Sequence, residues 1–173
     1  MSYTIRSART RDVPVIRKLI DSNAESGRLL SKPTVTLYED IQEFCVAELT
    51  DDAALAGCGA LHVMWEDLAE IRTVAVSDTC QGLGIGHGIV DTLLQRARAL
   101  GVDRVFCLTF AVDFFARHGF REISGTPVAG EVYRELLRSY DEGVAEFLDL
   151  EWVKPNTLGN TRMLLRLLPE REK

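Results

Sequence analysis

Apolar and polar positions alternate, or repeat at helical spacing, along most of the chain, and they predict strands interleaved with helices. The first helix is expected to begin with Thr10 as N-cap. Further helices are expected over residues 35–41, 85–99, 112–118 and 131–140. Strands are expected over residues 4–7, 43–49, 54–65, 69–76, 104–109, 120–123, 146–153 and 163–168. This order, with one early antiparallel hairpin over residues 54–76, indicates a mixed α/β sheet.

Length and composition indicate one compact domain that covers residues 1–173. The chain is 46% hydrophobic and 27% charged, which is enough to bury one good core. Its formal net charge of -6 disfavours nucleic acid and anionic membranes as partners. We expect a cytoplasmic protein, because the amino-terminal residues lack the apolar stretch of a secretory signal and no later run is long enough to span a bilayer.

The cysteines and histidines give no metal-site spacing. Cys45, Cys58, Cys80 and Cys107 are not arranged as a metal knuckle or a redox pair, so we expect reduced thiols. His62 and His118 also lack a companion ligand at suitable spacing, and His62 could instead reach a substrate pocket. No metal is predicted.

A glycine-rich segment, Gln81-Gly82-Leu83-Gly84-Ile85-Gly86, lies between a predicted strand and the most regular predicted helix. It would place backbone N–H groups without obstructing side chains at the positive end of the helix dipole, where a pyrophosphate fits. The segment differs from both the dinucleotide fingerprint and the Walker loop. Taken alone, it is equally consistent with a tight strand-to-helix turn.

The order of these elements resembles the GNAT acetyltransferase superfamily. The strand Ile71-Arg72-Thr73-Val74-Ala75-Val76, the glycine-rich segment and the helix after it are similar to that family's cofactor site. Residues 105–109, followed by Phe114-Phe115-Ala116-Arg117-His118-Gly119-Phe120, resemble its later strand, helix and Gly-Phe step. The resemblance covers essentially the whole chain. It implies an α/β GNAT fold with a mixed, mostly antiparallel sheet that is splayed at the cofactor and flanked by helices.

The resemblance also implies an acetyl-CoA site. The strand would pair with the pantetheine amides, N–H groups near its centre would polarise the thioester carbonyl, the loop would hold the pyrophosphate, and two phenyl rings would pack on the pantetheine arm. The implied cofactor residues are Val74, Ala75, Val76, Gln81, Gly82, Leu83, Gly84, Ile85, Gly86, Phe114 and Phe115.

Three segments resemble more narrowly the short, stand-alone actinobacterial amino-acid N-acetyltransferases that make N-acetylglutamate for arginine biosynthesis. These segments are residues 27–32, 69–76 and 154–165. An amino-acid acceptor needs donors for its carboxylates, which suits basic side chains at Lys32 and Arg72, although either could be a solvated charge. The implied acceptor residues are Leu30, Lys32, Arg72, Thr73 and Asn160. Asn156, Asn160, Arg162 and Lys154 could equally be ordinary turn residues.

Transfer to an amine requires a neutral amine, so a carboxylate near the acceptor is expected as the base. Glu70 aligns with the glutamate that has this role in the synthases the chain resembles, but it could instead be an exposed carboxylate or a partner of Arg72. Many superfamily members protonate the leaving thiolate from a tyrosine where this chain has Phe114-Phe115. The general acid is therefore unassigned: Thr109 or water could supply the proton, or the thiolate could leave unassisted.

These features predict an enzyme that moves the acetyl group of acetyl-CoA directly to the α-amine of L-glutamate, with L-glutamine as an alternative acceptor. Alternative hypotheses are an acetyltransferase for another small amine or a peptide amino terminus, and a non-catalytic acyl-CoA sensor. A homodimer is compatible with the resemblance, although no residue pattern requires one.

Overall fold

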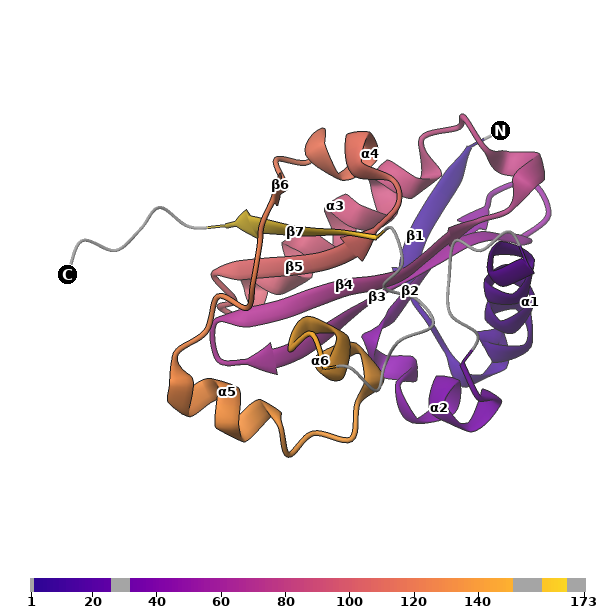
Figure 1. Cartoon of the computed structure of the whole chain (residues 1–173). Helices are drawn as coiled ribbons and strands as arrows, with labels where there is room; N and C mark the ends of the chain where they lie inside the picture. The colour runs from indigo at the N-terminus through magenta and orange to yellow at the C-terminus, as the bar shows by residue number, and fades with distance from the viewer. Residues whose placement is uncertain (1, 26–31, 151–159, 168–173) are drawn as a thin grey trace. The chain divides into compact units, whose positions relative to one another are not determined.

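The computed structural model describes residues 2–25, 32–150 and 160–167 (Figure 1). The strands are β1 Tyr3–Ser7, β2 Phe44–Leu49, β3 Leu55–Trp65, β4 Leu68–Val76, β5 Arg104–Thr109, β6 Arg121–Glu122 and β7 Thr161–Arg166. The α-helices are α1 Val13–Glu25, α2 Thr34–Glu39, α3 Ile85–Ala99, α4 Val112–Ala116, α5 Gly130–Leu136 and α6 Glu142–Phe147. Single turns of 3-10 helix occur at Thr10–Asp12, Ile41–Glu43 and Asp78–Cys80.

The strands form one sheet in the order β1-β2-β3-β4-β5-β7-β6. β1 and β2, β2 and β3, β5 and β7, and β6 and β7 are antiparallel, whereas β4 and β5 are parallel. This confirms the predicted mixed, mostly antiparallel α/β sheet with flanking helices. None of the helices in the described part of the chain has the length and apolar character needed to cross a membrane.

The chain divides into two compact units that share β3 and β4. The first contains Met1–His62 and Ile71–Leu100, and the second contains Val63–Glu70 and Gly101–Lys173. The division falls within β3 and β4, so each of these strands contributes residues to both units. That the whole chain acts as one domain stays a prediction.

In the first unit, helices pack on both faces of the strands because the side chains of β3 alternate (Figure 1). Cys58 and Ala60 belong to a buried cluster with α1 and α2. Gly57 and Gly59 face α3, where a methyl group on Gly59 would lie 2.5 Å from the side chain of Ile89. The absence of side chains at these two glycines allows α3 to approach the strand closely. The apolar residues of the cluster around α1 and α2 include Val13, Ile16, Ile20, Leu37, Phe44 and Val46.

The second unit has its own apolar cluster beneath α5 and α6. Phe106 of β5 and Phe147 of α6 are fully buried, and their rings pack edge to face with centroids 5.0 Å apart. Met64, Leu68, Leu136, Val144 and Leu148 complete the buried part of this cluster.

Two local predictions are wrong. Residues 146–150 are not extended, because Asp141 caps a helix there by accepting the N–H of Val144 at 2.9 Å. Residues 151–153 of that predicted strand lie outside the described residues. Thr10 does not cap α1: a 3-10 turn precedes the helix, and the Asp12 carboxylate accepts the N–H of Arg9 at 2.8 Å.

Candidate functional site

The glycine-rich loop leads into α3 with two residues in the left-handed region. Gly82 and Gly84 have φ angles of 78° and 77°, which side chains other than glycine rarely adopt. Gly84 is the N-cap of α3, so the first N–H groups of this 15-residue helix open toward the loop. The loop is solvent-exposed from Gln81 to Gly84. This backbone can receive an anion such as a pyrophosphate at the positive helix end.

Two side chains hold this loop in place. The Gln81 side-chain amide donates to Asp78 Oδ1 at 2.8 Å. The Tyr3 hydroxyl donates to the Gly84 carbonyl at 3.1 Å, which ties the loop to β1. Gly88 leaves space for this tyrosine, because a methyl group there would lie 2.9 Å from the Tyr3 hydroxyl. No local pattern in the sequence indicates this role of Tyr3, because Tyr3 and Gly84 lie far apart along the chain.

The middle of β4 contains an unusual backbone conformation. Thr73 has a φ of +60° within the strand, although it is β-branched and only 8% exposed. Such a conformation costs about 1–3 kcal/mol and is typical of functional sites. The Cys58 thiol donates to the Thr73 carbonyl at 3.8 Å, and burial raises the pKa of Cys58 to about 12. Cys58 is therefore a protonated thiol that supports the backbone conformation of Thr73.

This conformation separates the predicted acceptor residues from the predicted cofactor residues on β4. After Thr73, Ala75 is buried in the cluster with α1 and α2, while Val74 contacts the α3 side near Gly59. Val74 and Val76 are half-buried. The left-handed backbone of Thr73 therefore lies between the two sets of predicted residues.

Arg72 lies in a charged cluster with two residues that the sequence analysis did not connect to it. Its Nη2 lies 3.7 Å from Glu43 Oε2, and the other oxygen of that carboxylate lies 2.6 Å from His62 Nδ1. Glu43 comes just before β2, His62 is on β3 and Arg72 is on β4. Spacing along the chain gives no sign of this cluster, because sheet pairing alone brings the three together.

Lys32 precedes α2 in the same unit. It is half-buried, and its carbonyl accepts a hydrogen bond from the Arg17 guanidinium of α1. This bond anchors the backbone of Lys32 next to the helix pair that covers one face of the strands. Leu30 and Asn156 fall outside the described residues. Asn160 is described and half-buried immediately before β7.

Glu70, the candidate base, is buried in the second unit at 3% exposure. It lies opposite Phe106 where β4 pairs with β5. Burial raises the pKa of the Cys107 thiol well above its usual value, and the charge of Glu70 adds to this effect. The alternative of a solvent-exposed strand carboxylate is therefore wrong. A buried carboxylate on this strand is a suitable candidate for proton transfer.

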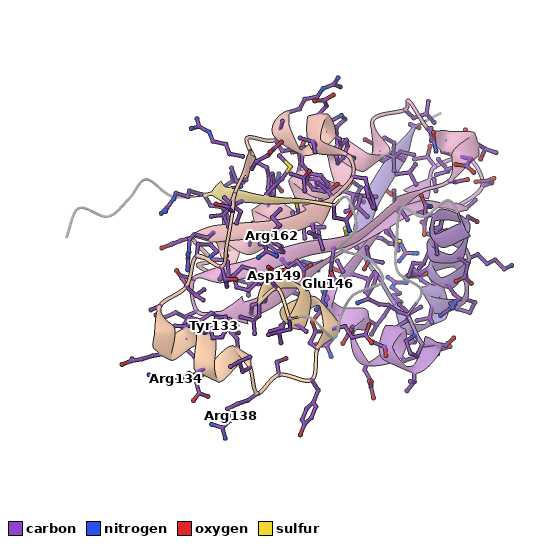
Figure 2. The ribbon with its side chains drawn as sticks, viewed as in Figure 1. Tyr133, Arg134, Arg138, Glu146, Asp149 and Arg162 are labelled. Atoms are coloured by element: carbon purple, nitrogen blue, oxygen red, sulfur yellow. The ribbon has the colours of Figure 1, made fainter. Side chains whose placement is uncertain are left out.

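Arg162 has a structural role in the second unit. It donates to the backbone carbonyls of Phe147, Glu146 at 3.0 Å and Gly125 at 3.2 Å. Its guanidinium carbon lies 5.1 Å from the centroid of the Phe106 ring. Figure 2 shows Arg162 beside Glu146 and Asp149, whereas Arg134 and Arg138 lie on and after α5.

The surroundings of Arg162 shift the pKa of its guanidinium in two opposing directions. Burial lowers its pKa, while the nearby carboxylates Asp149, Glu146 and Glu70 act in the opposite direction. The guanidinium thus lies in the electrostatic environment of the candidate base. Its hydrogen bonds, however, go to the end of α6, so we assign it to holding that helix on β7.

The two phenylalanines of α4 differ in their surroundings. Phe115 is buried and packs edge to face with Phe120 at 5.3 Å, whereas Phe114 is half-buried and packs against His118 at 5.5 Å. Phe114 is therefore the more accessible of the two rings. Thr109, an alternative proton donor, accepts the N–H of Ala111 at 2.9 Å and keeps its own O–H to donate.

All four cysteines are buried and free. Burial raises the pKa of Cys45 to about 11 and that of Cys58 to about 12. Raised thiol pKa values disfavour the reactive thiolate. Among the residues that the structure describes, no three His, Cys, Asp or Glu side chains are grouped as a metal site.

The model of the "Acetyltransferase (GNAT) family" matches residues 15–120. The amino-acid acetyltransferase of Mycobacterium tuberculosis is 63% identical over 165 residues, which are 94% of either chain. The crystal structure of Rv2747 from the same organism, in complex with CoA, has a TM-score of 0.92 and 63% identity, with 95% of this chain and 99% of that chain covered.

A more distant group of relatives is longer. The amino-acid acetyltransferase of Neisseria meningitidis serogroup A is 37% identical over 70% of this chain but only 28% of its own length. The N-acetylglutamate synthase of Neisseria gonorrhoeae, complexed with coenzyme A and N-acetyl-glutamate, has a TM-score of 0.76 and 26% identity, with 98% of this chain and 36% of that chain covered. The chain thus matches about a third of the length of these two proteins.

Proposed function

Because the chain belongs to the acetyltransferase (GNAT) family, we propose that it transfers the acetyl group of acetyl-CoA to the α-amine of L-glutamate, with L-glutamine as the alternative acceptor. The observation that carries this proposal is the 63% identity, over 94% of the chain, to an amino-acid acetyltransferase. The family assignment and acetyl-CoA as cosubstrate agree with the sequence predictions.

The first unit carries most of the residues proposed to bind acetyl-CoA. The backbone from Gln81 to Gly86 would receive the pyrophosphate, since Gly82 and Gly84 adopt left-handed conformations and α3 begins there. The residues Val74 to Val76 would pair with the pantetheine amides. A backbone N–H near Val74 would donate to the thioester oxygen as negative charge develops on it. The two rings of α4 in the second unit, Phe114 and Phe115, are proposed to pack on the pantetheine arm.

The acceptor is proposed to bind through basic side chains. Arg72 and Lys32 would pair with its carboxylates, while Thr73, Leu30 and Asn160 would line its side chain. A guanidinium suits a carboxylate because it offers parallel donors. The strained backbone at Thr73 would set the direction in which Arg72 points.

Glu70 is proposed to remove the proton from the ammonium group of the acceptor, directly or through one water. The neutral amine attacks the thioester carbonyl and the C–N bond forms. The nitrogen then loses a second proton, to the departing sulfur or to water, as the C–S bond breaks. The departing sulfur can leave as a thiolate, because a thiolate is a far weaker base than an alkoxide. Alternatively, it takes a proton from water or Thr109. No covalent enzyme intermediate is required.

We further propose that the enzyme acts in the cytoplasm as a single domain, 1–173, and that it can form a homodimer. Its partners would be small molecules rather than nucleic acid, because the net charge of -6 repels phosphate backbones.

The test is the initial rate of CoA release from acetyl-CoA with a panel of amino acids, polyamines and short peptides. We expect turnover with L-glutamate or L-glutamine, and we expect Glu70→Gln to lower kcat by roughly 10²- to 10⁴-fold, the usual contribution of a general base. Glu66→Gln, at the exposed turn before β4, is the matched control with the same change of charge.

Other outcomes would contradict separate parts of the proposal. Turnover of a polyamine or peptide alone would overturn the acceptor assignment. Binding of acetyl-CoA without turnover of any amine would favour a sensor. A Glu70→Gln enzyme as fast as Glu66→Gln would remove Glu70 as the base.

A further inference from the structure

Glu43 connects two charged side chains of the first unit but belongs to none of the groups assigned above. Its Oε1 lies 2.6 Å from His62 Nδ1, and its Oε2 lies 3.7 Å from Arg72 Nη2. The two partners come from neighbouring strands, β3 and β4. One carboxylate is therefore shared between side chains of two strands.

The backbone that carries Glu43 is itself held firmly. Glu43 ends the 3-10 turn Ile41–Glu43, and the Arg96 guanidinium of α3 donates to its carbonyl at 2.9 Å. The same guanidinium donates to the Gln42 carbonyl at 3.4 Å. The carboxylate thus extends from an anchored turn, which fixes the point from which it reaches toward Arg72.

The two distances from the carboxylate have different meanings. The His62 contact is a short hydrogen bond, whereas 3.7 Å to Arg72 is an ion pair without hydrogen-bond contact. The Arg72 side chain is only 8% exposed, so bulk water is largely excluded from this pair. Charges interact more strongly in such an environment than in water. Glu43 therefore orients the guanidinium without binding it as tightly as a bidentate carboxylate would.

We infer that Glu43 is a positioning residue, which orients Arg72 to receive the carboxylate of the amino-acid acceptor while His62 holds the other carboxylate oxygen. This rests on the proposed function, in which Arg72 binds the acceptor. A free arginine side chain loses rotamer entropy when it is fixed. Fixing it before the acceptor arrives lowers the cost of binding.

The experiment measures kcat and both KM values for Glu43→Gln, with Glu39→Gln as the matched control. Glu39 is exposed at the end of α2 and undergoes the same loss of charge. We expect Glu43→Gln to raise the KM for L-glutamate roughly tenfold, the loss that corresponds to imperfect orientation of one ion pair. The KM for acetyl-CoA and the value of kcat should change less than about twofold.

The same substitution made in the Arg72→Met enzyme distinguishes a positioning role of Glu43 from a merely structural one. If Glu43 acts through Arg72, then Glu43→Gln should add no further increase in KM to the Arg72→Met enzyme, because coupled residues are non-additive. Full additivity would overturn the inference. So would an equal rise in both KM values accompanied by a lower Tm, which is the signature of a structural clamp.

A third variant covers a folding failure. Glu43→Asp keeps the charge and shortens the side chain, and it should also raise the KM for the acceptor; a value equal to that of wild type would overturn the inference. Failure of the proposed function is visible separately, in the wild-type enzyme. A wild type that turns over neither L-glutamate nor L-glutamine overturns both proposals, whereas an active wild type with Glu43→Gln equal to Glu39→Gln overturns only this one.

Discussion

Arg72 of the first unit and Arg162 of the second unit are held in different ways. In the first unit, Arg72 is paired with the side-chain carboxylate of Glu43 at 3.7 Å. In the second unit, Arg162 donates to the backbone carbonyls of Phe147, Glu146 and Gly125. Backbone oxygens at a helix end need a donor whether or not a ligand is bound, so Arg162 is committed to the fold. Arg72 is paired with a side chain, which suits a residue that binds substrate.

Removing each guanidinium group in turn tests whether Arg162 stabilises the fold and Arg72 binds substrate. Arg162→Met should lower the free energy of unfolding by about 3 kcal/mol, because it leaves the backbone carbonyls at the end of α6 without their donor. Arg72→Met should cost less stability but should raise the KM for L-glutamate at least about tenfold. Chemical denaturation and steady-state kinetics measure the two effects. An Arg162→Met protein as stable as wild type would contradict the comparison.

A third arginine, Arg6, pairs with carboxylates, so its contribution to stability should depend on pH. Arg6 donates to Asp12 at 2.7 and 3.2 Å and to Glu48 at 2.6 Å. The hydrogen bond from Arg6 is the main reason that the pKa of Asp12 lies below its usual value, and the backbone N–H of Arg9 adds to it. Asp12→Asn should lower the free energy of unfolding by about 2 kcal/mol at neutral pH.

The sign of the pH effect follows from the direction of that shift. A lowered pKa in the folded state contributes stability above the unfolded value of about 4, and this contribution is lost as the pH falls through the folded value. The difference between wild type and Asp12→Asn should therefore be constant near neutrality and should shrink in acid. Asp51→Asn, at the exposed turn after β2, is the control and should show no such difference. A difference that grows in acid would contradict the assignment.

The smallest expected effect compares the two ends of α3. Gly84 and Gly101 have φ angles of 77° and 81°, so alanine at either position should cost about 1–2 kcal/mol of stability. Space is not limiting: a methyl group at Gly84 would have the Tyr3 hydroxyl 3.9 Å away, and one at Gly101 would have nothing within 4 Å. Only Gly84→Ala should raise the KM for acetyl-CoA, by several-fold, since only it disturbs the proposed pyrophosphate loop. An equal KM in both variants would remove the loop from that role.

Much of the fold could be predicted from the sequence because its elements have strong local patterns. The apolar stripe Ile85, Ile89, Leu93 and Ala97 predicted α3, and all four residues are buried. The small residues Gly57 and Gly59 allow the close approach of that helix. α6 was missed because its burial depends on Phe106 of a separate strand rather than on a long periodic pattern.

The candidate site was predicted only in part. Glu70, Arg72 and the glycine-rich loop were named from the order of motifs along the chain. Glu43 was not, because a residue 29 positions from Arg72 gains its role only when β2, β3 and β4 become neighbours. Arg162 was left open between a substrate contact and an ordinary turn, and only the location of the α6 end decided in favour of a structural role.

The sequence therefore determined most of the order of elements, the position of the glycine-rich loop and the residue types available for chemistry. These follow from local periodicity and from the steric freedom of glycine, which do not depend on distant neighbours. The tertiary structure alone decided which charges meet, why Thr73 adopts a φ of +60° and where each guanidinium donates. Those outcomes depend on contacts between residues far apart in sequence. Hydrogen bonds and charge pairs are stronger in a buried environment, so they favour one arrangement of these residues over the others.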